Sequence, residues 1–494
     1  MLRLLEIKKE FLKERENLFA SFNGKSDAFV FSKNYSLLLE DTIRIILADK
    51  KISFALASAG SFSRRELSPY SDIDLMIISN SIDKDDEEIK SLITSLWDGG
   101  IEASHTVREV TDIQKYLTTD LHTFTQFFET RFISGNDVLY NIWNTTLLDS
   151  INDETKKLLI TNFIDDVKQR HEKYGGSPKM LEPNVKMSAG GLRDFQSIEW
   201  MMMISSKHLL NSQHELTEAE MFINHLKKHK LTTAAECKRL LESYKLILTI
   251  RHLLHIITKS KTDRFEFTNQ LKLAAIFGFD ESDLMPFMKN YFNATNVVFR
   301  VTHTLIKKYK VEYVNPVPDS LSYHLDDDFY IKNKVIYQRK KETLTLSDIF
   351  RVFYYRVYHN AGFDDHLRTK IIEATENAEE NNWSQPDSSV FFREILNFSR
   401  HVGSTLSIMN ELGVLGAFLP EFGDLNGFMQ HGVYHCYTAD EHTLITIRNL
   451  EKLANQNSSY SQLYNSIKDK EIINLALLLH DIAKPIDISG HEII

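Results

Sequence analysis

Cysteine is almost absent from this chain. Its 494 residues include two cysteines, Cys237 and Cys436, which lie far apart in the sequence. Two distant cysteines provide no disulfide framework, so they exclude a disulfide-stapled secreted fold and fit a reducing cytoplasm. Proline and glycine are also sparse, with 9 and 18 residues. Because both residues interrupt helices, their scarcity favours a helix-rich protein.

Long apolar runs and an excess of basic residues are missing as well. No apolar run approaches the roughly 20 residues that a membrane-spanning helix needs, and residues 1–16 predict an amphipathic helix rather than a signal peptide. Lys and Arg number 58 against 68 Asp and Glu, which gives a net charge of −10. A sequence-independent nucleic-acid binder needs a net basic face. We therefore expect a cytoplasmic protein with no membrane or nucleic-acid partner, in which a local basic pocket can still hold a triphosphate.

The pattern of the chain predicts an α+β, mostly helical fold with several domains. A hydrophobic content of 43% with 26% charged residues is ordinary globular composition, and the length suffices for two to four domains. The expected units are N-terminal helices over 1–50, a small mixed-sheet domain over 51–145, a helical domain over 146–310, a connector over 311–345, a helical linker region over 346–418, and a last all-α block over 419–494.

Apolar runs in the second unit predict three strands, over residues 54–57, 73–78 and 101–107. An acidic helix over 83–97 is expected between the last two strands, and its acidic start is interpreted as a solvated helix N-terminus. Farther along the chain, residues 329–337 lean towards β-structure. A glycine-containing loop before a helix, over residues 175–194, interrupts the helical domain.

The most informative stretch is residues 60–75, where a Gly60-Ser61 turn precedes a strand that opens with Asp72 and Asp74. Residues i and i+2 of a strand point to the same side, and two carboxylates held so close repel each other unless a cation lies between them. Carboxylate oxygens are ligands for Mg²⁺, which nucleotidyl transfer uses. The turn permits close backbone approach and offers N–H donors to the β- and γ-phosphates. These features predict a nucleotidyltransferase site; a solvated strand start beside an ordinary turn is the alternative.

Arg64 lies between the turn and the two aspartates. One interpretation is that its guanidinium supports the leaving pyrophosphate. The other is a salt bridge with Glu66 or Asp72, and the sequence does not decide between them.

Several further segments combine polar and glycine residues in a distinctive order. They are Leu96-Trp97-Asp98 with Ile101-Glu102 and His105-Thr106-Val107-Arg108; Asp120-Leu121 with Glu129-x-Arg131; Asn184-Val185-Lys186 with Gly190-Gly191-Leu192-Arg193-Asp194 and Trp200; Arg251-His252-x-x-His255 with Asp263-Arg264-x-x-Phe267; Leu419-Pro420-Glu421; His435-x-Tyr437-Thr438-x-Asp440-Glu441-His442-Thr443; and His480-Asp481-Ile482-Ala483-Lys484. Together with residues 60–75 they resemble the bacterial PII uridylyltransferase/uridylyl-removing enzymes, which lie within the polymerase-beta-like nucleotidyltransferase superfamily.

The resemblance implies the parts of the first site that spacing alone does not give. It implies a third carboxylate on a neighbouring strand, for which Glu102 is the best-placed candidate, although a surface glutamate is the competing interpretation. It also makes Gly190, Gly191 and Arg193 candidates for nucleotide binding, against the alternative of a helix cap held by an Arg–Asp pair. It implies UTP as the donor and a tyrosine of the PII nitrogen-signal protein as the acceptor. No residue of the sequence selects uracil.

The resemblance further implies that the last block is an HD phosphohydrolase with a metal held by His442, His480 and Asp481. Imidazoles and a carboxylate suit Mn²⁺ or another divalent ion, and such an ion generates hydroxide for attack on a phosphodiester. Lys484 is expected to contact phosphate. His435 and His491 are further candidates at this site.

The chain departs from the family's pattern in two ways. Ser61, Ser63 and Arg65 stand where the family usually has a more glycine-rich turn, and the family continues through a complete HD domain into two ACT domains while this chain stops at Ile494. We therefore expect an incomplete HD half, in a truncated or naturally short protein. Two other functions stay open: nucleotidyl transfer to a different protein or small molecule, and nucleotide binding by a non-catalytic regulatory relative.

Overall fold

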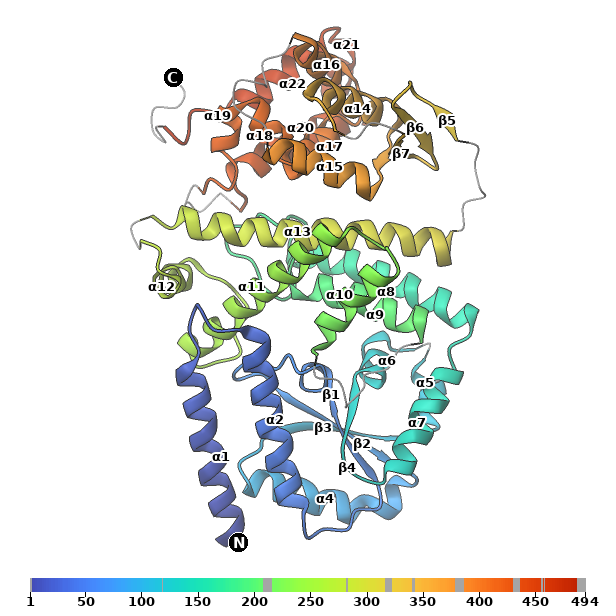
Figure 1. Ribbon diagram of the computed structural model, residues 1–494, viewed down its shortest axis with the longest axis vertical. Helices are drawn as coiled ribbons and strands as arrows, with labels where there is room; N and C mark the ends of the chain where they lie inside the picture. Colours follow the sequence, from blue (N-terminus) through green and yellow to red (C-terminus); the bar gives the residue numbers. More distant parts are fainter. Residues whose placement is uncertain are drawn as a thin grey trace.

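The computed structural model describes residues 2–117, 119–207, 216–280, 283–315, 322–339, 343–377, 386–429, 436–454, 456 and 458–486. A small sheet lies at one end of the molecule, helices fill the middle, and a second group of helices lies beyond the long helix α13 (Figure 1). The predicted α+β, mostly helical class is confirmed.

Two N-terminal helices, α1 (Leu2–Ser21) and α2 (Ala28–Leu47), pack against each other and against the sheet domain. The side chain of Asp27 caps α2 by accepting hydrogen bonds from the amides of Phe29 and Val30, which sets where this helix begins. Both helices fall within the predicted N-terminal helical unit over residues 1–50.

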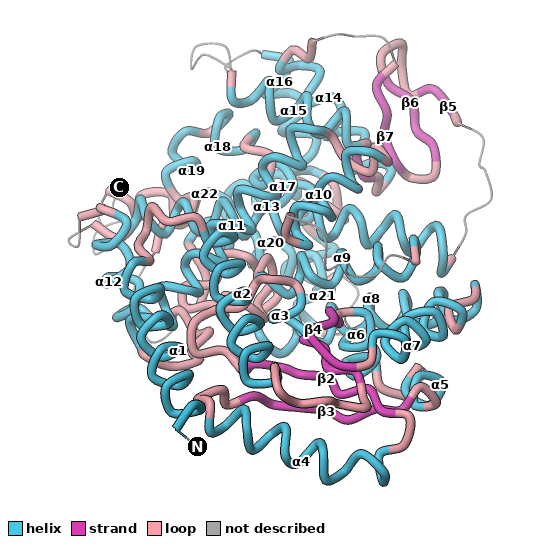
Figure 2. Tube along the Cα trace, turned by 60° about the horizontal axis from the view of Figure 1, so that its bottom comes forward, coloured by secondary structure: helices cyan, strands magenta, loops and turns pink. Residues whose placement is uncertain are grey.

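The first sheet has the strand order β3-β2-β1-β4. Its strands are β1 (Ala55–Ala59), β2 (Ile73–Ser79), β3 (Ala103–Glu109) and β4 (Thr130–Gly135). Strand β1 is antiparallel to β2 and β4, whereas β2 is parallel to β3. The three predicted strands are present with ends shifted by one or two residues, and β4 was not predicted. The domain around this mixed sheet also contains helices α3 (Gly60–Ser63), α4 (Ile82–Asp98), α5 (Asp112–Tyr116), α6 (Leu121–Phe128) and α7 (Asp137–Asp149). Helix α4 runs beside β3 (Figure 2).

The middle of the molecule consists of long helices around α13. They are α8 (Asp153–Tyr174), α9 (Leu192–Ser206), α10 (Glu218–Lys228), α11 (Ala234–Thr258), α12 (Phe267–Phe277) and α13 (Met285–Tyr309), which continues into a π-helix, η1 (Lys310–Val314). The predicted loop falls between α8 and α9.

A second sheet and the remaining helices form the C-terminal part. The sheet has the order β5-β6-β7-β8, with strands β5 (Tyr323–His324), β6 (Phe329–Lys332), β7 (Val335–Gln338) and β8 (Gly362–Phe363). The helices are α14 (Leu346–His359), α15 (Asp365–Glu376), α16 (Pro386–Asn397), α17 (Val402–Glu411), α18 (Val414–Phe418), α19 (Pro420–Asp424), α20 (Ala439–Leu453), α21 (Ser459–Ser466) and α22 (Lys470–Leu479). The β-leaning stretch 329–337 thus forms the hairpin of β6 and β7.

The buried apolar side chains form two cores. One extends from Phe11 to Tyr309 and also takes in Met429, so the first sheet and the middle helices share it. The other extends from Phe329 to Leu478. A shared core fixes the first sheet rigidly against α9 and α11, which lets one site draw residues from both.

Two sequence-level absences can be compared with the described residues. No helix among them is both long and apolar enough to cross a membrane. Cys237 is buried, Cys436 is exposed, and neither forms a disulfide.

Candidate functional site

A polar pocket lies where the first sheet meets the middle helices. Its charged and hydroxyl side chains come from both parts: Ser61, Arg64, Glu66, Ser71, Asp72 and Asp74 from the sheet domain, and Lys186, Arg251 and Lys261 from the helical region. The two aspartates of the sequence prediction therefore lie in a pocket, and four basic side chains lie there with them. This is the composition that a phosphate-bearing ligand and a divalent cation require.

The two aspartates differ in their surroundings. Asp72 directly precedes β2 and is half exposed, whereas Asp74 is the second residue of β2 and is less exposed. Burial and the nearby negative charge of Asp72 raise the pKa of the Asp74 carboxyl. Repulsion of this kind is relieved when a cation binds between the two carboxylates.

Gly60 shows why the turn carries a glycine. Its φ is +56°, and a Cβ at this position would lie 3.3 Å from Oδ2 of Asp74. Its amide donates a hydrogen bond to the carbonyl oxygen of Glu129 at 3.1 Å, so that N–H already has an acceptor. What this glycine supplies is close approach to the carboxylate, while Ser61 is the turn residue that lines the pocket.

Arg65 is one of the three positions at which the resembling family usually has a more glycine-rich turn, and its φ is 59°. This left-handed backbone conformation favours glycine and costs other residues about 1 kcal/mol. The position at which the resembling family carries glycine is therefore one where the backbone of this chain still adopts a glycine-like conformation.

Lys261 and Lys186, like Arg251, are pocket residues to which the sequence analysis gave no role. Lys261 follows α11 and forms an ion pair with Asp72, from which it is separated by 189 residues in the sequence. Burial, followed by the charges of Arg193 and Arg251, lowers the pKa of Lys186 to about 7. Lys186 is part of the Asn184-Val185-Lys186 motif. Its charge acts on Asp74 because of tertiary packing, which a local sequence pattern does not predict.

Arg64 has the salt bridge that the alternative interpretation expected. Its Nε lies 3.3 Å from Oε2 of Glu66, and its NH1 is paired with Glu129. All three side chains are buried, and the two carboxylates outweigh the effect of burial and raise the pKa of Arg64. Arg64 nevertheless lines the pocket, so contact with a leaving pyrophosphate remains a prediction.

Glu102 lies just before β3 and is exposed. It does not line the pocket, and the residue that pairs with Asp74 in the parallel register is Ser104. Glu66 is instead the glutamate that lines the pocket, but it is engaged by Arg64 and by the hydroxyl of Tyr244 at 2.7 Å. The role of Glu102 as a third carboxylate stays a prediction.

The Gly-Gly-Leu-Arg-Asp segment has a packing role in this structure. A Cβ on Gly190 would lie 2.2 Å from the carbonyl oxygen of Thr295, and one on Gly191 would lie within 3.0 Å of three carbonyl oxygens. The buried Asp194 accepts hydrogen bonds from the Gly190 amide at 2.8 Å and pairs with Arg170 at 2.7 Å. This is the capped helix start with an Arg–Asp pair that formed the alternative interpretation.

Arg193 lies beside this cap without lining the pocket. Its guanidinium carbon is 4.8 Å from the ring centroid of Trp200. Burial and the charge of Arg64 lower its pKa to about 10. The members of the central motif that reach the pocket are Lys186 and Leu192, and nucleotide binding by Gly190, Gly191 and Arg193 remains untested.

A second cluster lies in the C-terminal part, where α20 meets the end of α22. His442, His480 and Asp481 each offer a ligand atom, and these atoms lie within 4.8 Å of one another. The rings of His442 and His480 have centroids 6.1 Å apart. The three predicted metal ligands are thus brought together from residues 38 positions apart, because the His-Asp pair at the end of α22 converges on the first turn of α20. No other group of this kind occurs among the described residues.

Lys484 and Asp440 flank this cluster, and phosphate contact by Lys484 stays a prediction. Nζ of Lys484 donates a hydrogen bond to Oδ2 of Asp481 at 2.7 Å, so the lysine neutralises the buried carboxylate in this structure. Asp440 is fully buried and pairs with Lys179 of the loop between α8 and α9. His435 and His491 lie outside the described residues.

That loop connects the two sites by backbone hydrogen bonds, and its residues 177–187 are called the bridging segment below. At one end, the amide of Leu181 donates to the carbonyl of Cys436 at 3.1 Å, and the amide of Thr438 donates to the carbonyl of Lys179 at 3.2 Å. At the other end, the amide of Val185 donates to the carbonyl of Asp263 at 2.8 Å. The segment therefore touches both the start of α20 and the wall of the first pocket.

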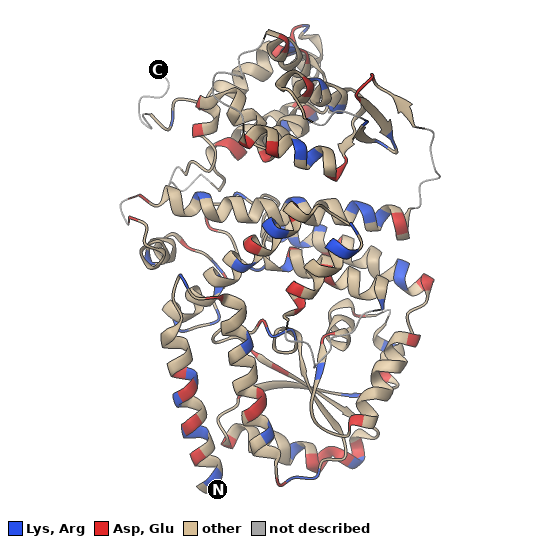
Figure 3. Cartoon of the chain, in the orientation of Figure 1, with Lys and Arg blue, Asp and Glu red and all other residues tan. Residues whose placement is uncertain are grey.

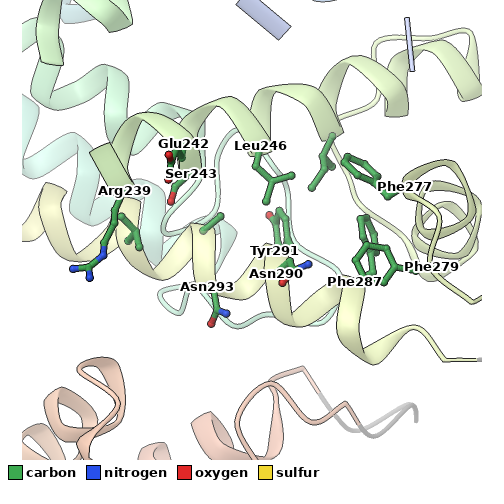
Figure 4. Close-up of a pocket in the computed structure, with 13 residues that line it drawn as sticks. Arg239, Glu242, Ser243, Leu246, Phe277, Phe279, Phe287, Asn290, Tyr291 and Asn293 are labelled. Carbon is green, nitrogen blue, oxygen red and sulfur yellow. The ribbon is translucent and has the colours of Figure 1, made fainter. Parts of the chain in front are cut away.

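A separate hollow between α11, α12 and α13 has a different character (Figure 4). Phe277, Phe279 and Phe287 gather at one end, and Arg239 lies at the other (Figure 4). Arg239 is paired with Glu236 and Glu376. The hollow lacks the paired carboxylates of the first pocket, so it is not the candidate site.

The fold and the two clusters define a class. A small mixed sheet carries paired aspartates at the start of β2 in a basic pocket, and a separate helical part carries a His-His-Asp cluster. This combination is expected of a nucleotidyltransferase joined to an HD-type phosphohydrolase.

Comparison with known proteins shows which family the chain resembles. A model of the family GlnD PII-uridylyltransferase matches residues 160–306. A bifunctional uridylyltransferase/uridylyl-removing enzyme of Nitrosococcus oceani is 30% identical over 447 residues, covering 87% of this chain and 48% of the relative. The enzymes of the same description from Hydrogenovibrio crunogenus and Haemophilus influenzae (strain PittEE) are 29% and 25% identical, covering 88% and 97% of this chain and 50% and 56% of the relative.

The resemblance to the bifunctional uridylyltransferase/uridylyl-removing enzymes is therefore confirmed. The chain spans about half the length of the curated relatives it matches.

Proposed function

We propose that this protein is a metal-dependent nucleotidyltransferase that transfers UMP from UTP to a tyrosine of a PII-type signal protein. We further propose that its C-terminal part belongs to the opposing reaction, hydrolytic removal of UMP, and that the protein acts in the cytoplasm. The observation that carries the first proposal is the placement of Asp72 and Asp74 in a pocket with Lys186, Arg251 and Lys261. The similarity to enzymes of this description supports the choice of UTP.

The donor set of the first pocket fits Mg²⁺. Two carboxylates lie together, one raises the pKa of the other, and a lysine ammonium already pairs with Asp72. Asp72 and Asp74 would hold the ion, which when bound neutralises triphosphate charge and polarises the α-phosphorus. The oxygen-only donors agree with a hard cation.

The protein side chains supply binding and orientation. Lys186, Lys261 and Arg251 present positive charge to the triphosphate from the helical side, opposite the aspartates of β2. In the proposed transfer, the tyrosine oxygen of the acceptor forms a bond to the α-phosphorus, and the bond to pyrophosphate breaks as the tyrosine loses its proton. Charge neutralisation by fixed cations is the main contribution a protein makes to such a step.

The second cluster fits a divalent ion with mixed donors. Two imidazoles and one carboxylate lie within ligand reach of a common point, a set that suits Mn²⁺ or a similar ion. His442, His480 and Asp481 would hold it, and when bound it lowers the pKa of water so that hydroxide attacks at neutral pH. Lys484, which pairs with Asp481 at 2.7 Å, would contact the phosphate at this site.

The experiment that tests the transfer proposal offers nucleotide and acceptor directly. The protein is incubated with labelled UTP or ATP, Mg²⁺ and purified PII protein, and the PII protein is then examined for covalent label. Label from UTP that requires Mg²⁺ is the expected result, with an EDTA reaction and a reaction without PII as controls. Label from ATP alone would overturn the choice of donor, and labelled product only from another acceptor would favour the alternative nucleotidyltransferase.

A further inference from the structure

Three basic side chains at the junction between α13 and the C-terminal helices act electrostatically on one another. Lys307 comes from the last turn of α13, Arg356 from α14 and Arg368 from α15. Figure 3 shows basic residues gathered at this end of α13, and Figure 1 shows α15 lying beside it. Thr304, one turn before Lys307 on α13, accepts a hydrogen bond from NH1 of Arg368 at 2.5 Å, which places α15 directly against this face.

The described acidic residues at this junction are mostly engaged by other cations. Glu236 pairs with Arg300 at 2.8 Å, Asp365 with Lys308 at 2.6 Å and Glu376 with Arg239 at 3.1 Å.

Glu411 is the remaining carboxylate. Its Oε1 is 4.0 Å from Nε of Arg300, and it acts electrostatically on both Lys307 and Arg356. Among the described residues, Lys307, Arg356 and Arg368 therefore have only Glu411 as a nearby counter-charge. Because Glu411 also lies close to Arg300, positive charge is in excess at this junction.

Neighbouring cations lower the pKa values of Lys307 and Arg356. Burial, followed by the charges of Arg368 and Arg356, lowers the pKa of Lys307. Burial and the charge of Arg368 lower the pKa of Arg356 to about 10, against the opposing effect of Glu411. Like charges held this close destabilise the protein unless an anion joins them.

The two arginines are held in place by hydroxyl groups, which leaves guanidinium donors for a ligand. NH1 of Arg356 donates to Thr405 at 2.5 Å, as NH1 of Arg368 does to Thr304. Nε of Arg368 is buried and makes no hydrogen bond with the described residues. Both arginines are partly buried, whereas the Lys307 side chain is desolvated in part but still reaches solvent, so the cluster opens to solvent on the lysine side.

We infer that Lys307, Arg356 and Arg368 form an anion-binding site for a phosphoryl group at the junction of the two parts of the molecule. A phosphate carries close to two negative charges and three acceptor oxygens at neutral pH, which matches an uncompensated cluster of two forked guanidiniums and an ammonium. This site is separate from the pocket of Asp72 and Asp74 and from the His-His-Asp cluster. Its ligand joins α13 to α14 and α15.

The test measures binding rather than activity. Thermal unfolding of the full chain is followed in EDTA, at constant ionic strength, while inorganic phosphate, pyrophosphate or UMP is added. The wild-type protein should gain stability with phosphoryl ligand, because binding to the native state adds RT ln(1 + [L]/Kd). Lys307→Met should weaken the apparent affinity by about tenfold, since it removes one charge-assisted contact. The same variant should be no less stable than wild type without ligand, because a repelling charge is gone.

Lys310→Met is the matched control, because Lys310 is an exposed lysine three residues farther along, at the start of η1. It should keep the wild-type response, and Arg368→Gln should lose it as Lys307→Met does. Stabilisation by inorganic phosphate or pyrophosphate identifies a free anion as ligand; stabilisation by UMP alone identifies a phosphate monoester. Equal stabilisation of wild type, Lys307→Met and Arg368→Gln by all three ligands would overturn the proposal, as would the absence of any stabilisation.

Discussion

Lys179 and Asp440, 261 residues apart in the sequence, form a fully buried ion pair between the bridging segment and the first turn of α20. The same carboxylate accepts hydrogen bonds from Nδ2 of Asn410 at 2.8 Å and from the amide of Gly427 at 3.1 Å. Although burial disfavours the charged form, Lys179 more than offsets it and lowers the pKa of Asp440. Asp440 therefore anchors the segment that touches both sites, two residues before His442.

Removal of one partner of this pair should destabilise the protein strongly. Lys179→Met leaves a buried carboxylate without its counter-charge, and such a loss costs about 3–5 kcal/mol. Urea unfolding of wild type and variant measures the difference. Lys179→Met with Asp440→Leu should recover part of the loss, since no buried charge is then left unpaired. A single variant as stable as wild type would show that the pair contributes little.

Loss of either pocket aspartate should abolish nucleotidyl transfer without unfolding the protein. Asp74→Asn removes a negative ligand while keeping the side-chain volume, and we expect a fall in transfer rate of about a hundredfold or more. Asp98→Asn, at the exposed end of α4, is the matched control and should keep wild-type activity. Transfer by Asp74→Asn within about threefold of wild type would contradict the assignment of this pocket.

The ion pair of Lys261 with Asp72 should compete with a divalent ion. Lys261→Met frees Asp72 and Asp74 from their internal counter-charge, so Mg²⁺ should raise the melting temperature of the variant more than that of wild type. The measurement is thermal unfolding with and without Mg²⁺, with EDTA as reference. A smaller Mg²⁺ effect in the variant would show that the lysine assists the ion.

Glu218 should make stability fall as pH rises. Burial, then the charges of Glu66 and Glu129, raise the pKa of its carboxyl from 4.5 to about 8. Between these values the folded state holds a proton that the unfolded state has released, so stability declines by up to about 1.4 kcal/mol per pH unit. Glu218→Gln should therefore gain stability relative to wild type at pH 8 compared with pH 5. An unchanged difference between the two pH values would refute the shift.

The His-His-Asp cluster should bind Mn²⁺ through all three residues. His480→Ala should weaken Mn²⁺ binding, measured by calorimetry, and slow UMP release from pre-modified PII protein while leaving transfer intact. His229→Ala is the control and should bind Mn²⁺ as wild type does, because His229 is an exposed histidine that directly follows α10 and is not part of this cluster. Equal Mn²⁺ binding by His480→Ala and wild type would remove the cluster as a metal site.

Local patterns predicted the parts of the structure that depend on local chemistry. The strand at Ile73, the aspartates that open it, and the His-Asp end of α22 are all encoded within about ten residues. Strand β4 was missed because it pairs with β1 across some 75 residues and its sequence ends in Ser134 and Gly135, which read as a turn. A period-2 signal is weak in so short a strand.

The basic half of the first pocket could not be predicted in the same way. Lys186 and Lys261 line the pocket because the sheet and the helices pack around one shared core. The residues next to a lysine in the sequence do not show that it will lie in such a pocket. Gly190 and Gly191 have a packing role that the sequence offered only as an alternative, because a Cβ at either position would clash with nearby carbonyl oxygens; their binding of nucleotide stays a prediction.

The contact between the bridging segment and residues 436–438 is made through main-chain groups, with Met180 opposite Tyr437 in an antiparallel bridge. Main-chain hydrogen bonds are the same for nearly every amino acid except proline. Apart from the buried pair of Lys179 and Asp440, side chains along this seam can therefore diverge without altering how the two parts of the molecule are docked. Substitutions near either site can therefore change its surroundings while the distance between the two sites stays constant.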